Sequence, residues 1–163
     1  MVIDKYLIDV DTLDILPKGQ DKIIYFRWCK CPDCILFENE ILKKYENINI
    51  PNFYVIEVDE YRMYKDDEEK SYIWTDFTKR FGIDKYQGGR IPCIVKYRFN
   101  RFMDMMVYLN DVFDDNKIVG SYYNDCPFIG RSVLSRESYY DLATSFHNKK
   151  ADEFFSKHIL NGF

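Results

Sequence analysis

The residues of this chain best suited to chemistry are three cysteines that fall within one short segment. Residues 26–34 read FRWCKCPDC and contain Cys29, Cys31 and Cys34, which are three of the five cysteines in the chain. Cysteine thiolates attack disulfides and also bind metal ions. Cysteines this close in sequence therefore indicate a redox centre, a metal site, or buried thiols that are neighbours by chance.

Two predicted elements must position this segment. Residues 21–28, DKIIYFRW, are short, β-branched and aromatic, and they follow the turn-like PKGQD, which predicts a buried strand. Residues 32–47, PDCILFENEILKKYEN, predict a helix, because Pro32 suits the first helical position and Asp33 suits the positive end of the helix dipole. The cysteines thus lie at a strand-to-helix junction, where a helix N-terminus lowers the pKa of a thiol.

The rest of the chain alternates predicted strands and helices. Residues 52–60 predict a second strand, whose nearly continuous apolar character suits a parallel sheet, and residues 71–84 predict a helix that ends at Gly82. The charged run 61–70, YRMYKDDEEK, is expected to be an exposed loop without function. The later predicted elements are a strand at 93–99, a strand at 117–123, and an amphipathic helix at 135–160 with Asn148 as the place where a break would fall. This order predicts an α/β fold in which helices cover the faces of a mixed sheet.

Length and composition limit the classes of protein. A chain of 163 residues with 47% hydrophobic and 18% aromatic residues predicts one folded domain spanning 1–163. The net charge of −4 and the absence of a basic run argue against a nucleic-acid partner. The longest apolar runs span only a few residues, such as IIYF at 23–26, so neither a signal peptide nor a membrane span is expected.

These observations favour a cytoplasmic location, where clustered cysteines are more often catalytic or metal-binding than structural. The frequent use of Lys, Ile, Asn and Tyr further suggests an AT-rich bacterial genome.

The surroundings of the cysteines resemble the thioredoxin-like superfamily. The sequence CPDC at 31–34 is similar to the active-site tetrapeptide of a thioredoxin-related subgroup whose motif reads Trp-Cys-Pro-Asp-Cys. Here Lys30 precedes the first cysteine, and the tryptophan stands earlier as Trp28. As is frequent in the family, a phenylalanine, Phe26, lies five residues before Cys31.

A second part of the chain carries the same resemblance. Residues 77–97, FTKRFGIDKYQGGRIPCIVKY, resemble the family's helix, loop and cis-proline strand. The resemblance identifies Pro92 as the cis-proline. It covers roughly residues 5–160 at the level of the fold, and its motifs are specific at 23–45 and 77–98.

The resemblance implies a thioredoxin-like central mixed sheet flanked by helices, with insertions at 61–70 and 99–116. It implies a thiol–disulfide oxidoreductase in which Cys31 attacks a disulfide and Cys34 resolves the mixed disulfide. No cofactor, metal, nucleic acid or membrane is expected. The expected partners are a disulfide-containing protein or small thiol substrate and a reductase that donates electrons. The residues expected to shape the site are Pro32, Asp33, Trp28, Lys30, Ile91, Pro92 and Cys93.

The chain departs from the family in one respect that concerns proton transfer. Family members often keep a buried acid six residues before the first cysteine as a proton acceptor for the second thiol, whereas this chain has Tyr25 there. The lysine that accompanies that acid would fall near Val55 and is also missing. These losses predict an activity slower or narrower than that of a general reductant.

The charges beside the first cysteine act in opposite directions. The carboxylate of Asp33 disfavours a second negative charge nearby, so it should raise the pKa of Cys31 and favour a reducing centre. Lys30 should partly offset that effect.

Two alternatives to turnover remain open. One is a thioredoxin-fold binding or accessory module that uses the same groove without catalysis. The other is a zinc site made by the sulfurs of Cys29, Cys31, Cys34 and Cys93, although no second Cys-x-x-Cys and no close histidine supports it.

Four further residues with reactive or ligating side chains are expected to have structural roles. Cys29 lies outside the Cys-x-x-Cys pair and is expected to be a structural thiol, and Cys126 is expected to be a small buried apolar residue. His147 and His158 are expected to lie on the surface or to pack, rather than to act as a ligand or a base.

Overall fold

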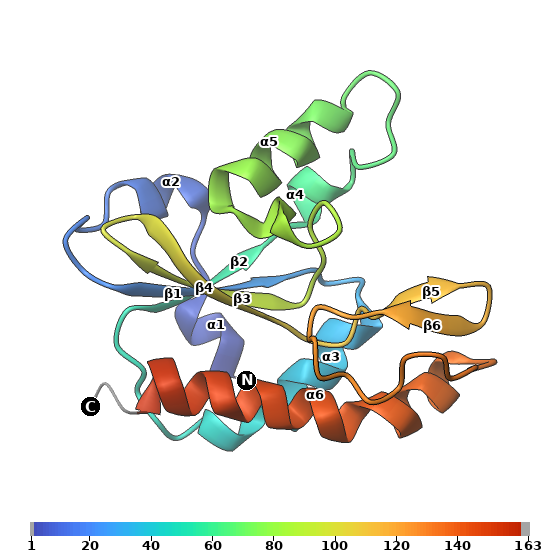
Figure 1. Cartoon of the computed structure of the whole chain (residues 1–163). Coiled ribbons are helices and arrows are strands. Elements are labelled where there is room, and N and C mark those ends of the chain that lie inside the picture. The colour runs from blue at the N-terminus through green and yellow to red at the C-terminus, as the bar shows by residue number, and fades with distance from the viewer. Residues whose placement is uncertain (1, 161–163) are drawn as a thin grey trace.

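The computed structural model describes residues 2–160 and places a four-stranded sheet between two layers of helices (Figure 1). The strand order is β2-β1-β3-β4, in which β1 pairs with β2 in parallel and β3 pairs antiparallel with both β1 and β4. The strand bounds are Lys22–Arg27 for β1, Phe53–Glu57 for β2, Cys93–Arg98 for β3 and Arg101–Val107 for β4. The predicted α/β fold, in which helices cover the faces of a mixed sheet, is confirmed.

Each face of the sheet has its own apolar core because side chains alternate along the strands. Tyr25 on β1 packs with Phe37 and Phe155 on one face, and its neighbour Phe26 packs with Phe77 and Phe81 on the other. The helices on the Tyr25 face are α1 (Val2–Tyr6), α3 (Pro32–Glu40) and α6 (Arg136–His158). Those on the Phe26 face are α2 (Val10–Asp14), α4 (Asp59–Arg62) and α5 (Ser71–Phe81).

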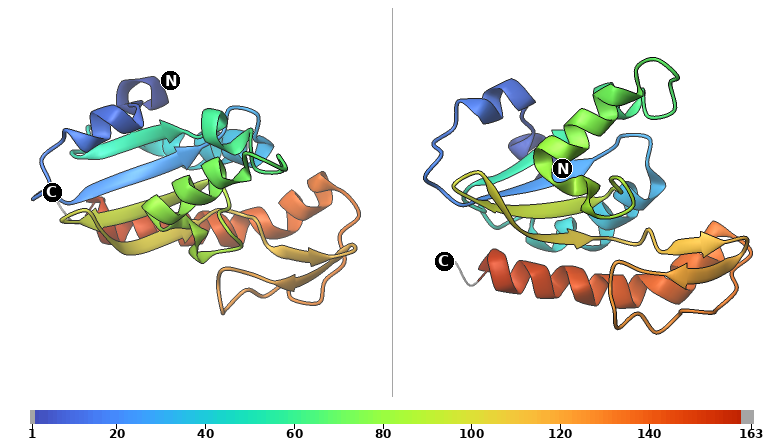
Figure 2. Two further views of the ribbon diagram at one scale, coloured as in Figure 1. Left: turned by 90° about the horizontal axis from the view of Figure 1, so that it is seen from above. Right: turned by 45° about the horizontal axis from the view of Figure 1, so that its top comes forward.

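Shorter elements complete the described chain. Two 3-10 turns, η1 (Leu42–Tyr45) and η2 (Ile83–Lys85), follow α3 and α5. The strands β5 (Val112–Asp114) and β6 (Lys117–Gly120) form a separate antiparallel hairpin. Figure 2 shows this hairpin standing out from the end of the main sheet, beside the start of α6. The predicted strand at 117–123 therefore exists in shorter form and does not belong to the main sheet.

The expected insertion at 99–116 is wrong for residues 101–107, because these form the edge strand β4 of the main sheet. A two-residue turn at Phe99 and Asn100, both with positive φ (51° and 59°), connects β3 to β4. Such a turn matches the twist of a hairpin, but phenylalanine rarely adopts this backbone conformation. The turn therefore carries no recognisable sequence signal.

Two helix predictions need correction. The helix predicted at 32–47 ends at Glu40, and the buried residues Leu42 and Tyr45 then lie three apart on a 3-10 turn, where Tyr45 stacks on Phe155 at 4.5 Å between ring centroids. The break considered near Asn148 does not occur, and α6 is continuous over 23 residues. The Asn148 side chain accepts a hydrogen bond from the Tyr108 hydroxyl, so it does not compete for the helix backbone.

Two other segments also differ from expectation. The N-terminal residues form α1 and α2, two helices that were not predicted, and Asp9 caps α2 by accepting from the Thr12 N–H at 2.7 Å. The run 61–70 is only partly exposed: residues 66–70 and Met63 are exposed, whereas Tyr61 is half-buried and stacks on Phe77 at 4.3 Å between ring centroids. The predicted helix end at Gly82 is confirmed, with a φ of 77°.

Among residues 2–160, no helix combines the length and apolar character needed to cross a lipid bilayer.

Candidate active site at the start of helix α3

Cys31 is the N-cap of α3 and lies at the end of the loop that connects β1 to this helix. Its backbone is extended (φ −98°, ψ 112°), and its sulfur accepts a hydrogen bond from the Cys34 N–H at 3.2 Å. Pro32 occupies the first helical position, as predicted. The pKa of Cys31 is lowered because the Cys34 side chain and N–H both hydrogen bond to its sulfur, while burial and the Asp33 charge oppose the shift.

Cys34 lies one turn into α3 and is fully buried. Burial raises its pKa far above that of an ordinary thiol, and the neighbouring Cys31 and the charge of Glu38 raise it further. The two thiols therefore differ: the pKa of Cys31 is lowered, and the pKa of Cys34 is strongly raised. Both cysteines are free thiols in this structure.

The peptide bond between Ile91 and Pro92 is cis, and it lies against the first cysteine. The Ile91 carbonyl oxygen is 4.0 Å from the Cys31 sulfur, although the two residues are 60 positions apart. The side chain of Asn110 donates to the same carbonyl at 2.8 Å and to the Tyr108 carbonyl at 3.0 Å. Asn110 therefore fixes the loop that faces the cysteine, and the sequence gave no reason to single it out.

Trp28 and Lys30 both contact Asp59 at the start of α4. The Trp28 indole N–H donates to Asp59 at 2.9 Å, and the Lys30 ammonium lies 3.6 Å from the same carboxylate oxygen. The guanidinium of Arg62 stacks over the Trp28 ring at 4.0 Å from its centroid. The structure thus directs Lys30 to Asp59 and not to Asp33, and it brings Arg62 to the site from the segment expected to be an exposed loop.

Asp33 faces α6 and is half-buried. It accepts a hydrogen bond from the Tyr140 hydroxyl. Burial raises the pKa of Asp33, while Tyr140 and the charge of Arg136 act in the opposite direction. The sequence could not place Tyr140 or Arg136 here, because they lie more than 100 residues further along the chain.

The three remaining cysteines lie in different environments. Cys29 is exposed. Cys93 is fully buried behind Pro92, and burial raises its pKa. Cys126 is buried in the core, as predicted. Within residues 2–160, no three His, Cys, Asp or Glu side chains gather closely enough to hold a metal ion.

The two histidines also make structural contacts. His147 is fully buried, accepts the Leu109 N–H at its Nδ1 (3.1 Å), and lies with its Nε2 3.0 Å from the Asp111 carboxylate. His158 lies 2.6 Å from Asp104 at the far end of α6. The partners in these contacts are Leu109, Asp111 and Asp104, none of which belongs to the cysteine pair.

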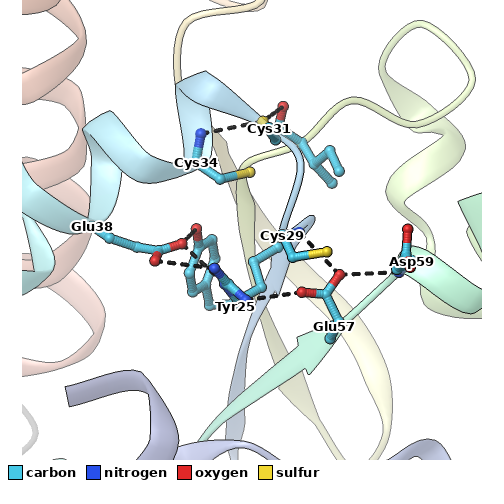
Figure 3. Close-up of polar contacts among 9 residues, drawn as sticks. Tyr25, Cys29, Cys31, Cys34, Glu38, Glu57 and Asp59 are labelled. Atoms are coloured by element: carbon cyan, nitrogen blue, oxygen red, sulfur yellow. Dashed lines mark hydrogen bonds and ion pairs between the residues drawn. The ribbon is translucent and has the colours of Figure 1, made fainter. Parts of the chain in front are cut away.

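A buried carboxylate on α3 contacts Tyr25, the residue six positions before Cys31. Glu38, one turn after Cys34 on α3, has only 4% of its side chain exposed and accepts a hydrogen bond from the Tyr25 hydroxyl at 2.9 Å. Arg27 donates to both Glu38 oxygens, at 3.0 and 3.3 Å. Figure 3 shows Cys34 and Glu38 on α3, with the Glu38 carboxylate directed toward Tyr25 of β1. The i, i+4 spacing of Cys34 and Glu38 is the only sequence signal for this arrangement.

The same arginine connects this buried group to the loop before Cys31. Arg27 pairs with Glu57 at 2.8 Å, and Glu57 in turn accepts the N–H groups of Cys29 (3.2 Å) and Asp59 (3.0 Å). These contacts, drawn in Figure 3, hold residues 28–30 against the end of β2. The loop that presents Cys31 is therefore anchored by charge-assisted hydrogen bonds.

No protein-family model matches the chain, and no curated protein matches it in sequence. Solved structures with a similar arrangement include the reduced thioredoxin pre-protein of Schistosoma mansoni, with 15% identity, coverage of 63% of this chain and 85% of that chain, and a TM-score of 0.39. A thioredoxin of Malassezia sympodialis has 17% identity, 63% and 76% coverage, and a TM-score of 0.39. Mitochondrial thioredoxin 3 of Saccharomyces cerevisiae has 13% identity, 63% and 81% coverage, and a TM-score of 0.37. Identities and scores this low leave the chemistry to be argued from the site itself.

Proposed function

We propose that this thioredoxin-like chain is a thiol–disulfide oxidoreductase that acts through Cys31 and Cys34, as one domain spanning 1–163. The observation that carries the proposal is the difference between the two thiols. Cys31 has a lowered pKa and lies at a helix N-terminus, whereas Cys34 is buried three residues later with a strongly raised pKa. A reactive first thiol and a protected second thiol are what stepwise disulfide exchange requires.

The reaction proceeds in two exchanges. The Cys31 thiolate attacks one sulfur of a substrate disulfide, forming a mixed disulfide and releasing the other substrate sulfur as a thiolate. Cys34 then loses its proton and attacks the Cys31 sulfur, which releases the second substrate thiolate. The substrate gains two electrons and the protein is left with a Cys31–Cys34 disulfide. A dithiol reductant, supplied in the cell by a reductase, restores the two thiols.

The proton of Cys34 needs an acceptor, because the thiol is fully buried. Glu38 and Tyr25 are the groups that support this step: the charge of Glu38 raises the pKa of Cys34, and Cys34 in turn adds to the raised pKa of the buried Tyr25. In the proposed step the Tyr25 oxygen takes the Cys34 proton while the Tyr25 proton moves to Glu38. The carboxylate thus replaces the acid that the sequence lacks at position 25.

The proposed setting is a reducing compartment such as the cytoplasm, where Cys31 and Cys34 would be kept in the reduced, dithiol form. The proposed partners are disulfide-bearing proteins or small disulfides.

One observation favours a second candidate function. Only 7% of Cys31 is exposed, which limits access to its sulfur. A module that binds a partner in the groove beside Cys31 without turnover would tolerate such limited access. The two candidates differ in whether a covalent intermediate forms.

Trapping of that intermediate tests the proposal. In a Cys34→Ser variant, a mixed disulfide between Cys31 and a small disulfide such as hydroxyethyl disulfide should accumulate, since nothing resolves it. Cys31→Ser should form no adduct, and Cys29→Ser is the matched control that should behave like wild type. Absence of both adduct and turnover would leave the binding module as the better account.

A further inference from the structure

A cavity of about 390 Å³ lies at the end of the main sheet that is remote from the cysteine pair. The loop between α2 and β1 and the turn between β3 and β4 meet at this end, whereas α3 begins at the other (Figure 1). Ligand pockets commonly have volumes of about 300–1,000 Å³, so the cavity is large enough for a small molecule.

Part of the lining of this cavity is apolar. Its apolar and aromatic side chains are those of Leu13, Ile24, Phe81 and Tyr97. The last three are buried in the core on the Phe26 face of the sheet, and Leu13 packs against that core. The Tyr97 hydroxyl donates to the Phe81 carbonyl at 2.6 Å, so the tyrosine offers its ring to a ligand. This part of the cavity suits a hydrocarbon group.

Lys22, which also lines the cavity, is a buried cation without a carboxylate partner. It is 3% exposed, and no ion pair among residues 2–160 includes it. Its ammonium donates to the Pro17 carbonyl at 2.7 Å and to the Asn100 side-chain oxygen at 3.1 Å. Because an ammonium has three N–H donors, one remains for a further acceptor. Burial lowers the pKa of Lys22, as is expected of a cation with no opposite charge beside it.

The other charged side chains of the lining leave an excess of positive charge. Arg80 is paired with Asp14, so the charges of these two residues balance. Lys18 is exposed and, like Lys22, belongs to no ion pair in the described part of the chain. The lining therefore contains two cations without a counter-charge, and its one carboxylate is already paired.

The acid next to Lys22 in sequence is engaged elsewhere. Asp21 accepts hydrogen bonds from Arg98 at 3.2 Å on both oxygens, lies 3.8 Å from the Lys96 ammonium, and does not line the cavity. Lys22 is thus buried with neutral oxygens as its hydrogen-bond partners. Burial of a charge without an opposite charge costs free energy, part of which a bound anion would recover.

We infer that this cavity binds a small monocarboxylate with an apolar tail, whose carboxylate contacts the Lys22 ammonium and whose tail packs on Ile24 and Phe81. A single negative charge matches the single buried cation. A phosphate would bring a second charge, for which the lining offers only the exposed Lys18. A carboxylate that accepts from an ammonium forms a charge-assisted hydrogen bond, which is stronger in a buried site than in water. The inference is independent of the proposed exchange reaction, since no cysteine lines the cavity.

Calorimetric titration of the full chain with four probes tests this inference. The probes are octanoate, neutral octanol with the same tail, acetate with the same head group and no tail, and inorganic phosphate. We expect octanoate to bind about tenfold more tightly than octanol, because octanol lacks the charge that Lys22 would contact. Acetate and phosphate should show no measurable binding at concentrations that saturate the site with octanoate, because neither fills the apolar part of the cavity.

Variants assign the binding to this cavity. Lys22→Met removes the charge and keeps a side chain of similar length, so it should weaken octanoate binding by about tenfold and leave octanol binding unchanged. Lys43→Gln, at an exposed lysine that does not line the cavity, is the matched control and should bind both probes like wild type. Leu13→Trp changes a half-buried lining residue, should fill the cavity and block both probes, and decides the question if Lys22→Met does not fold. Cys31→Ser should bind octanoate like wild type.

Each contrary outcome removes the carboxylate site. Equal affinity for octanoate and octanol, or wild-type octanoate affinity in Lys22→Met or Leu13→Trp, would overturn it. Absence of octanoate binding to the wild-type chain would also overturn it and would leave Lys22 as a structural link between Pro17 and Asn100. None of these results bears on the exchange reaction, which the trapping of the mixed disulfide tests separately.

Discussion

Replacing Glu38 by glutamine removes a negative charge from beneath Cys34 while keeping the size of the side chain. Glu38 accepts hydrogen bonds from Tyr25 and Arg27, and 4% of its side chain is exposed. If Glu38 receives the Cys34 proton, Glu38→Gln should slow the resolving step and leave the attack by Cys31 intact. General-base catalysis typically contributes about 10²–10⁴-fold, so we expect resolution to slow by about 100-fold.

The same substitution should also destabilise the fold to a limited extent. A hydrogen bond to a charged group contributes about 1.5–3 kcal/mol, and the glutamine oxygen can still accept one bond. Arg27 keeps its pair with Glu57 at 2.8 Å and is itself 18% exposed, so it is not left as an isolated buried charge. We therefore expect a loss of about 2 kcal/mol, or about 4–8 °C in Tm for a chain of this size.

Rapid mixing followed by acid quench measures the two steps separately. In wild type the mixed disulfide between Cys31 and the substrate should be short-lived, and in Glu38→Gln it should accumulate before Cys34 displaces the substrate. The matched control is Glu57→Gln, which removes the other carboxylate of Arg27 and should cost stability without prolonging the mixed disulfide. Tyr25→Phe tests whether the proton passes through the phenol, in which case the mixed disulfide should again accumulate.

The reasoning fails if Glu38→Gln resolves the mixed disulfide at the wild-type rate. It also fails if Glu57→Gln prolongs the mixed disulfide equally, because the effect would then follow from lost anchoring of Arg27 and not from proton transfer.

Two further predictions concern the helix that carries the pair and the turn after α5. Asp33→Asn should lower the pKa of Cys31 by about one unit or less, because one of the charges that opposes ionisation is removed, and pH-dependent alkylation of Cys31 measures this. The disulfide should become more oxidising by about 30 mV or less, and an unchanged alkylation profile would contradict the effect. Gly82→Ala should lower the free energy of unfolding by about 1–3 kcal/mol in chemical denaturation, because its φ is 77° and an added Cβ would lie 2.8 Å from the Phe102 ring. A loss below about 0.5 kcal/mol would show that the turn relaxes.

Local signals predicted the part of the site that lies in one stretch of chain. The strand before the CPDC motif, the helix that begins at Pro32, and the end of α5 at Gly82 each depend on a backbone preference that neighbouring residues reveal. The cis-proline was identified through the resemblance of residues 77–97, and the bond is cis.

Features that depend on distant partners could not be predicted in this way. Strand β4 contains methionines and an aspartate and follows a turn at Phe99 with no turn signature, so only its pairing with β3 identifies it. Tyr140 reaches Asp33 from α6, 107 positions away. Glu38 reads as an ordinary polar helix residue until Tyr25 and Arg27 are seen to surround its carboxylate.

The central claim is that Cys31 and Cys34 form one reversible redox pair. The most direct measurement equilibrates the protein in a series of reduced and oxidised dithiol buffers and maps the disulfides by mass spectrometry at each step. The account predicts a single two-electron transition in which Cys31 becomes joined to Cys34 while exposed Cys29 stays free. A disulfide from Cys29 to either residue, or no Cys31–Cys34 disulfide in the most oxidising buffer, would contradict it.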